Sequence, residues 1–276
     1  MTGLSHRQTE ILNIARASGR VTVEDLSRRF EVSAQTIRKD LNDLCEQRSL
    51  TRIHGGAIIA SGVENLAYEA RRFVAAEEKK AIGAAAAARI PNGCSLFINI
   101  GTTTEEVASA LTSHEDLLVI TNNLNVAMLL YRHPRIEVIV AGGAVRRADG
   151  AVVGSTATQL ISQFKVDYAI IGASAIDEEG ALLDFDYREV QAAQAIIANA
   201  RSVMLVADAT KLRRSAPVRI AQISQIQTFV TDAALPAGLA NICHSRGIEV
   251  IVATSKVAGE IDEADTETAP IALRRV

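Results

Sequence analysis

The segment Gly101-Thr102-Thr103-Thr104 combines the residue types that bind phosphate, and it follows a short apolar run at 95–100. A glycine lets a ligand approach the backbone closely, and the three hydroxyls are able to donate hydrogen bonds. The helix predicted to follow adds free N–H groups and the positive end of its dipole. The segment therefore predicts a phosphate-binding turn, with an ordinary helix start that carries spare threonines as the alternative. It is not a Walker loop, because no Gly-Lys-Thr follows.

Four more loops follow apolar runs and are similarly small and polar. Their candidate effector-binding residues are Thr121, Asn122 and Asn123 in the first, Gly142, Gly143 and Arg146 in the second, Ser174 in the third and Lys211 in the fourth. Each loop alone is typical of an ordinary turn. Five such loops in succession indicate a shared site, in which a cation such as Lys211 meets an anion.

A group of carboxylates lies between the third and fourth of these loops. Asp184, Asp186 and Glu189 are able to hold the hydroxyls of a sugar or polyol. The alternative is catalysis, because an aldose–ketose isomerase needs a carboxylate base within hydrogen-bond reach of its substrate. The five histidines form no metal-ligand spacing and no evident triad. We therefore expect no metal, no cofactor and no catalytic residue.

Short apolar runs after residue 93 predict seven strands, and helices fit between most of them. The predicted strands are 95–100, 117–121, 137–141, 168–172, 202–207, 228–231 and 249–252, and the predicted helices are 103–111, 125–131, 156–163 and 188–200. This alternation is typical of an α/β fold with a mostly parallel sheet covered on both faces. Ligands of such sheets bind beyond the carboxyl ends of the strands, where the polar loops begin.

The first sixty residues predict a winged helix-turn-helix. Capping residues at Ser5, Thr22 and Ser33 start three short helices, and a strand pair that turns near 54–56 forms the wing. Apolar residues at i, i+4 and i+7 place one side of the third helix in the core. The candidate DNA-binding residues lie on its other side and on the wing: Gln35, Thr36, Arg38, Lys39, Arg52 and His54. A solvated face of an ordinary helical domain is the alternative.

Composition narrows the class of protein. The 276 residues are enough for two domains, 48% of them are hydrophobic, and the formal net charge is −3. No run approaches the ~18 apolar residues of a membrane span, so we expect no membrane partner. The cysteines Cys45, Cys94 and Cys243 form no C-x-x-C pair, which is typical of a reducing cytoplasm.

Two runs in the predicted DNA-binding head, residues 1–60, resemble the DeoR family of bacterial repressors: 32–41 and 52–57. In that family, a helix of the pattern S-x-x-T-I-R-x-D-L enters the major groove. The resemblance implies that Ser33 also contacts DNA and that Asp40 orients rather than contacts. After residue 93, the loops at 101–103, 121–122, 142–143, 172–174 and 208–211 resemble those of the DeoR-type sensor domain, which is related in fold to ribose-5-phosphate isomerase. The longer matching runs 97–103, 121–127 and 183–190 imply glycerol 3-phosphate as the effector. One departure is Asn99, where the family often has Asp.

We therefore expect a winged helix-turn-helix at 1–60, a linker and connecting helix at 61–92, a mostly parallel α/β sensor domain at 93–256 and a disordered tail at 257–276. The function expected is that of a cytoplasmic repressor, a homo-oligomer (dimer or tetramer) that a phosphorylated effector releases from operator DNA. A sensor of another sugar phosphate and an isomerase-like enzyme with a DNA-binding head are the alternatives.

Overall fold

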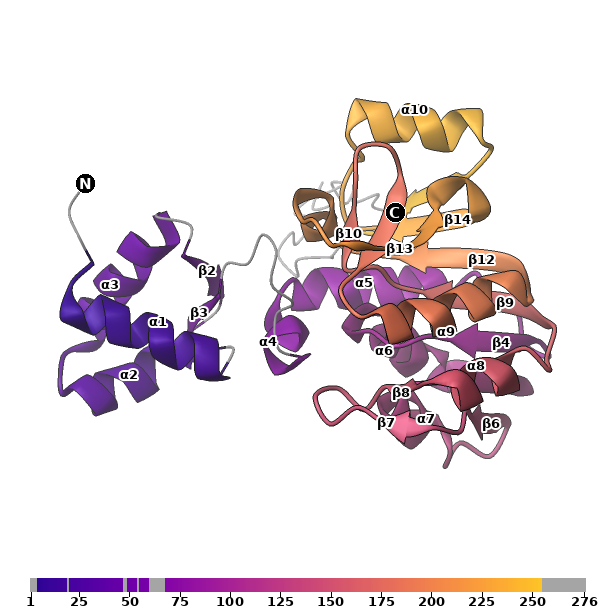
Figure 1. The fold of residues 1–276 in the computed structure, drawn as a ribbon, viewed down its shortest axis with the longest axis horizontal. Coiled ribbons are helices and arrows are strands. Elements are labelled where there is room, and N and C mark those ends of the chain that lie inside the picture. The colour runs from indigo at the N-terminus through magenta and orange to yellow at the C-terminus, as the bar shows by residue number, and fades with distance from the viewer. Residues whose placement is uncertain (1–3, 19, 47–48, 54, 60–67, 255–276) are drawn as a thin grey trace, which may run out of the picture.

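The structure, a computed structural model, describes residues 4–18, 20–46, 49–53, 55–59 and 68–254. Figure 1 shows a smaller body built from the first six elements and a larger body in which helices surround a sheet. His54 and the predicted tail, 257–276, lie outside the described residues.

The smaller body contains three helices and a three-stranded antiparallel sheet. Its elements are α1 (His6–Ser18), β1 (Arg20–Thr22), α2 (Val23–Phe30), α3 (Ala34–Glu46), β2 (Leu50–Ile53) and β3 (Gly56–Ile59), with strand order β1-β3-β2. The hydroxyls of Ser5, Thr22 and Ser33 each accept a hydrogen bond from the backbone N–H three residues later, so all three predicted caps are present. The helices, the turn and the β2–β3 wing have the predicted order, whereas β1 was not predicted.

The core of this body fixes which side of α3 is exposed. Ile37, Leu41 and Leu44 are fully buried, as their spacing predicts, and they pack with residues of α1, α2 and the sheet. The opposite side of α3 is therefore available to a partner.

The larger body is built on a parallel sheet of seven strands in the order β15-β14-β12-β9-β4-β5-β6. In chain order these are β4 (Ser95–Ile98), β5 (Leu117–Thr121), β6 (Ile136–Val140), β9 (Val166–Ile171), β12 (Ala200–Val206), β14 (Thr228–Thr231) and β15 (Glu249–Val252). All seven predicted strands are present, and the prediction of a mostly parallel α/β domain is confirmed.

Helices cover both faces of the sheet because alternate strand residues point to opposite sides. Leu96 and Ile98 belong to the core cluster that includes residues of α5 (Ala76–Ala87), α6 (Thr102–Ala110) and α7 (Leu124–Leu130). Phe97 belongs to the cluster on the other face, which includes residues of α8 (Ser155–Ile161), α9 (Tyr187–Ala198) and α10 (Ala237–Ser245). The strands read as continuous apolar runs for this reason.

Several elements were not predicted. In the segment 61–92, expected to hold a linker and one helix, the structure places a short helix, α4 (Tyr68–Phe73), before α5. Helix α10 is a second such element. The others are a sheet of β10 (Ala175–Ile176), β11 (Ala181–Asp184) and β13 (Val218–Gln222), the hairpin of β7 (Ala144–Val145) and β8 (Val152–Val153), and the 3-10 turns η1 (Leu111–Ser113), η2 (Ala209–Arg213) and η3 (Ile223–Gln225).

Candidate functional site

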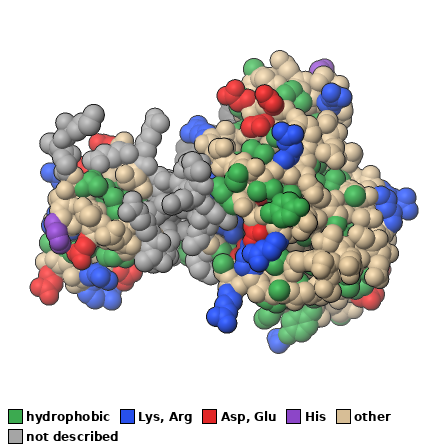
Figure 2. Space-filling view, viewed as in Figure 1, with side chains coloured by type: hydrophobic (Ala, Val, Ile, Leu, Met, Phe, Trp, Pro, Cys, Tyr) green, Lys and Arg blue, Asp and Glu red, His purple; other side chains and the backbone are tan. Residues whose placement is uncertain are grey.

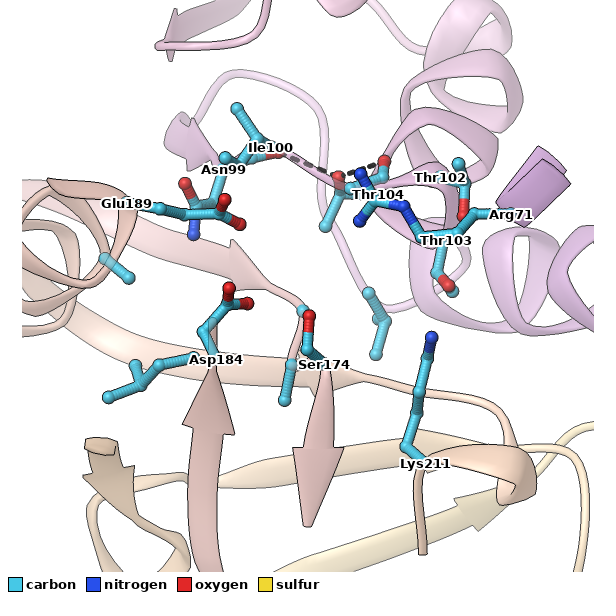
Figure 3. Close-up of a pocket in the computed structure, with 16 residues that line it drawn as sticks. Arg71, Asn99, Ile100, Thr102, Thr103, Thr104, Ser174, Asp184, Glu189 and Lys211 are labelled. Atoms are coloured by element: carbon cyan, nitrogen blue, oxygen red, sulfur yellow. Dashed lines mark hydrogen bonds between the residues drawn. The ribbon is translucent and has the colours of Figure 1, made fainter. Parts of the chain in front are cut away.

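A pocket lies beyond the carboxyl ends of β4, β9 and β12, where the predicted loops meet. Of the residues predicted to bind an effector, those that line it are Gly101, Thr102, Thr103, Thr104, Ser174, Asp184, Glu189 and Lys211. Figure 3 shows these side chains converging from the start of α6, the small antiparallel sheet, α9 and η2. Segments more than a hundred residues apart in the sequence thus form one cavity.

The start of α6 is shaped to receive an anion. Gly101 has a φ of 142°, a conformation that side chains rarely adopt, and it caps α6 without a side-chain hydrogen bond. The Thr104 hydroxyl lies 2.7 Å from the carbonyl oxygens of both Asn99 and Gly101, which holds the turn in place. The first N–H groups of an α-helix have no partner within the helix, so they are available to a phosphate beside Thr102 and Thr103.

Two cations flank this helix start. Lys211 is 8% exposed, and burial lowers the pKa of its ammonium to about 7, although Asp208 beside it acts in the opposite direction. Arg71 reaches the pocket from α4, and its buried Nε has no hydrogen-bond partner among the described residues. The Lys211 ammonium and the Arg71 guanidinium are hydrogen-bond donors, and a bound anion stabilises their charged forms.

The other side of the pocket is acidic. Asp184 is 4% exposed, and its carboxylate accepts hydrogen bonds from the backbone N–H groups of Phe185 and Asp186 at 2.6 and 3.3 Å. Burial, followed by the nearby Asp184, raises the pKa of Glu189 to about 8, although Arg146 opposes the shift. The pocket therefore has a cationic side suited to phosphate and an acidic side suited to hydroxyls.

The structure places the remaining predicted effector residues outside the pocket lining. These are Thr121, Asn122, Asn123, Gly142, Gly143, Arg146 and Asp186. Thr121 and Asn123 support the fold, since the Thr121 hydroxyl donates to the Ile98 carbonyl at 2.6 Å and the Asn123 amide caps α7. Gly142 and Gly143 are exposed beside the β7–β8 hairpin.

Arg146 forms ion pairs with three carboxylates. Its guanidinium pairs with Asp149 at 2.5 Å, Glu189 at 2.7 Å and Asp186 at 2.8 Å. Arg146 therefore acts on the pocket through Glu189, and Asp186 caps α9 while it pairs with Arg146.

Sequence reasoning missed the two other polar residues of the lining, Arg71 and Asn99. Arg71 lies in a segment without a clear period, so no local pattern marked it. Asn99 was noted only as a departure from a family pattern, yet it lines the pocket and is 2% exposed, and its Oδ1 has no hydrogen-bond partner in the described part of the chain.

The exposed side of α3 carries the residues predicted to read DNA. Gln35, Arg38 and Lys39 are exposed, and Thr36 is half-buried. Arg52 is exposed on the wing strand β2. Figure 2 shows positive and negative side chains interspersed over the visible face of the molecule, so charge there is not gathered into one patch.

Two other polar residues at α3 have structural contacts. The Ser33 hydroxyl accepts from the Thr36 N–H at 3.2 Å and so caps the helix. Asp40 is 6% exposed and pairs with Arg7 of α1 at 2.5 Å, which fixes α3 against α1. This contact fits the orienting part that the family resemblance implies for Asp40.

Among the described residues, no group of three or more His, Cys, Asp or Glu side chains is arranged to hold a metal ion. No helix in the same residues is long and apolar enough to cross a membrane.

Comparison with known proteins assigns both bodies. Residues 7–63 match the DeoR-like helix-turn-helix domain, and residues 74–233 match the DeoR C-terminal sensor domain. The chain belongs to the DeoR family. It is therefore a transcription regulator with a DNA-binding head and a sensor domain.

Its relatives match along nearly their whole length. The chain is 43% identical over 246 residues to the glycerol-3-phosphate regulon repressor of Escherichia coli (strain K12), covering 89% of this chain and 98% of that protein. It is 42% identical to the repressor of the same name from Haemophilus influenzae, covering 92% and 98%, and 41% identical to the HTH-type transcriptional repressor CsqR of Escherichia coli (strain K12), covering 89% and 94%. These names confirm the prediction of a repressor rather than an enzyme.

Solved structures match the larger body more weakly. The ribose 5-phosphate isomerase A from Methanocaldococcus jannaschii aligns with a TM-score of 0.38 and 16% identity, over 50% of this chain and 55% of that one.

Proposed function

We propose that this DeoR-family repressor is released from its operator when a small phosphorylated polyol, glycerol 3-phosphate, binds in the pocket. The observation that carries the proposal is the division of the pocket into two sides. Thr102, Thr103 and Lys211 suit a phosphate, whereas Asp184 and Glu189 suit hydroxyls. The names of two relatives, glycerol-3-phosphate regulon repressors, support the same effector.

Asn99 supports a polyol at the junction of the two sides. Its buried Oδ1 lacks a partner in the described part of the chain and is able to accept a hydrogen bond from a hydroxyl. An aspartate at this position would place another negative charge beside Glu189 and the incoming phosphate. We infer that the neutral amide favours a strongly anionic ligand.

The DNA side of the proposal rests on α3. We propose that Gln35, Arg38 and Lys39 on its exposed side enter the major groove and that Ser33 and Thr36 at its start lie beside the phosphates. Arg52 on the wing strand β2 would contact the DNA backbone, and His54, predicted to act with it, lies outside the described residues. Paired half-sites require paired heads, so we propose a homo-oligomer, dimer or tetramer, acting in the cytoplasm. Its mass in solution, measured by light scattering, tests this part.

The test of the effector is an operator titration followed by fluorescence anisotropy. The protein first selects its operator from randomised DNA, and the complex is then titrated with glycerol 3-phosphate, other sugar phosphates, glycerol and inorganic phosphate. Glycerol 3-phosphate is expected to lower operator affinity by roughly 5- to 150-fold, the usual range of allosteric coupling. Release by a sugar phosphate instead would assign the pocket to that ligand. Conversion of a sugar phosphate into product would contradict the sensor assignment and support the alternative, an isomerase-like enzyme with a DNA-binding head.

A further inference from the structure

Helix α4 (Tyr68–Phe73) is the first described element after β3, which ends the DNA-binding head at residue 59. It also supplies a pocket-lining residue, Arg71. Figure 3 shows the Arg71 side chain extending beside Thr103 and Thr104 into the pocket.

Polar contacts hold α4 on the sensor body. The Tyr68 hydroxyl donates to Glu105 of α6 at 2.6 Å and accepts from the Asn125 amide of α7 at 3.0 Å. The buried Lys79 of α5 donates to the backbone carbonyl of Arg71 at 2.5 Å. Three helices of the body thus fix both ends of α4.

The ion pair of the Arg71 guanidinium is longer than the hydrogen bonds that hold α4 at Tyr68 and at the Arg71 carbonyl. Its Nη2 lies 3.4 Å from the Asp149 carboxylate, beyond the ~2.7–2.9 Å of a good charge-assisted hydrogen bond. Asp149 already pairs with Arg146 and accepts from the Ala151 N–H, so it does not depend on Arg71. The Arg71 Nε is buried and has no hydrogen-bond partner among the described residues, and Arg71 lines the pocket.

A bound phosphate would offer Arg71 a better partner than Asp149 does. A phosphate monoester carries nearly two negative charges at neutral pH and accepts a bidentate pair from a guanidinium. Lys211 on the opposite wall is a second cation that such an anion would hold. If Arg71 exchanges its ion-pair partner, from Asp149 to the phosphate, its guanidinium would move. The short helix α4, which carries Arg71, would move with it.

We propose that Arg71 is an effector-binding residue and that α4 transmits its movement to the DNA-binding head. In this mechanism the phosphate draws Arg71 away from Asp149, and the Tyr68 contacts with Glu105 and Asn125 set the pivot about which α4 turns. Each state has its own partner for Arg71, so the element has two arrangements that ligand binding biases. The inference rests on the proposed function, since it supplies the path by which that effector acts.

The sharpest test is Tyr68→Phe, because it removes the hydroxyl that joins α4 to α6 and α7 and changes no pocket-lining residue. Two quantities are measured: the Kd for glycerol 3-phosphate by calorimetry, and the release ratio, defined as operator Kd with saturating effector divided by operator Kd without it. We expect effector Kd within about 3-fold of the unsubstituted protein, with a release ratio that falls to nearly 1 from the usual 5- to 150-fold. The matched control is Tyr131→Phe, which removes a hydroxyl contact to Arg132 on the exposed part of the body and should change neither quantity.

A second variant, Arg71→Lys, keeps the charge and loses the fork of donors. It should weaken effector binding about tenfold and lower the release ratio as well. A Tyr68→Phe protein with an unchanged release ratio, or an Arg71→Lys protein with unchanged effector binding, would overturn the inference. Failure of the proposed function is recognised separately, because the unsubstituted protein would then show no release by glycerol 3-phosphate.

Discussion

Lys211 should make the affinity for the proposed effector depend on pH in a range where most lysines do not titrate. Burial lowers the pKa of its ammonium to about 7, with Arg214, Lys79 and Arg71 acting in the same direction and Asp208 against them. A phosphate bound beside Lys211 favours the charged form, so binding takes up a proton. Effector affinity should therefore fall as pH rises above the pKa of the unliganded lysine.

The size of the effect follows from the fraction of Lys211 that is protonated. With a pKa of about 7, half of the lysine is charged at about pH 7 and only about 3% at about pH 8.5, so affinity should fall by up to about 15-fold. The phosphate itself stays a dianion across this range, because its second pKa is near 6. Binding at about pH 7 should take up roughly half a proton per site from Lys211.

Calorimetry with glycerol 3-phosphate in buffers of different ionisation enthalpy measures both the affinity and the proton uptake. Lys211→Arg should bind the effector with a flat pH profile, since a guanidinium stays charged throughout. The pKa of Glu189, raised to about 8 chiefly by burial, falls in the same window. Glu189→Gln removes that contribution and should keep the Lys211 slope. Equal affinity at both pH values in the unsubstituted protein, with the effector bound, would refute the reasoning.

Three further outcomes are expected. Arg38→Ala should abolish operator binding in a shift assay and leave the effector Kd unchanged, whereas Arg201→Ala on the exposed surface of the body should change neither. Gly83→Ala should lower the free energy of unfolding by about 1–3 kcal/mol, because its Cβ would meet the Glu106 backbone at 2.7 Å, while Gly238→Ala meets nothing within 4 Å and should not destabilise. Inorganic phosphate should bind the pocket and release the operator less than glycerol 3-phosphate does; equal release by phosphate alone would show that the acidic side is not needed.

The sheet was predictable because its strands are apolar on both faces, and the inner strands are buried on both. Each strand is a short continuous apolar run, and a polar turn marks each carboxyl end, so sequence alone located all seven. The small antiparallel sheet was not predictable in the same way. Its first strand, Ala175–Ile176, is too short to show a period, and the carboxylate it helps to place, Asp184, therefore looked like a loop residue.

The pocket was only partly predictable, since long-range pairing decides which charged groups remain available. Lys211 and Arg146 look alike in sequence, as cations that follow small polar loops. Arg146 meets Glu189, forty-three residues away, and is neutralised by it, whereas Lys211 is buried in the pocket wall. Arg71 gave no local indication at all, because its place depends on how α4 packs against α6.

One chain of ion pairs joins the two sides of the pocket. Glu189 on the acidic side pairs with Arg146, Arg146 pairs with Asp149, and Asp149 is the partner of Arg71 on the cationic side. In the proposed mechanism, a hydroxyl that binds Glu189 would compete with Arg146 for its carboxylate. Arg146 would then pair more fully with Asp149, and Asp149 would release Arg71 to the phosphate more easily. A ligand that carries both groups acts on this chain from both ends, whereas phosphate or glycerol alone acts from one. The contact at Asp149 thus gives a physical reason why a phosphorylated polyol, rather than either of its parts, would move α4.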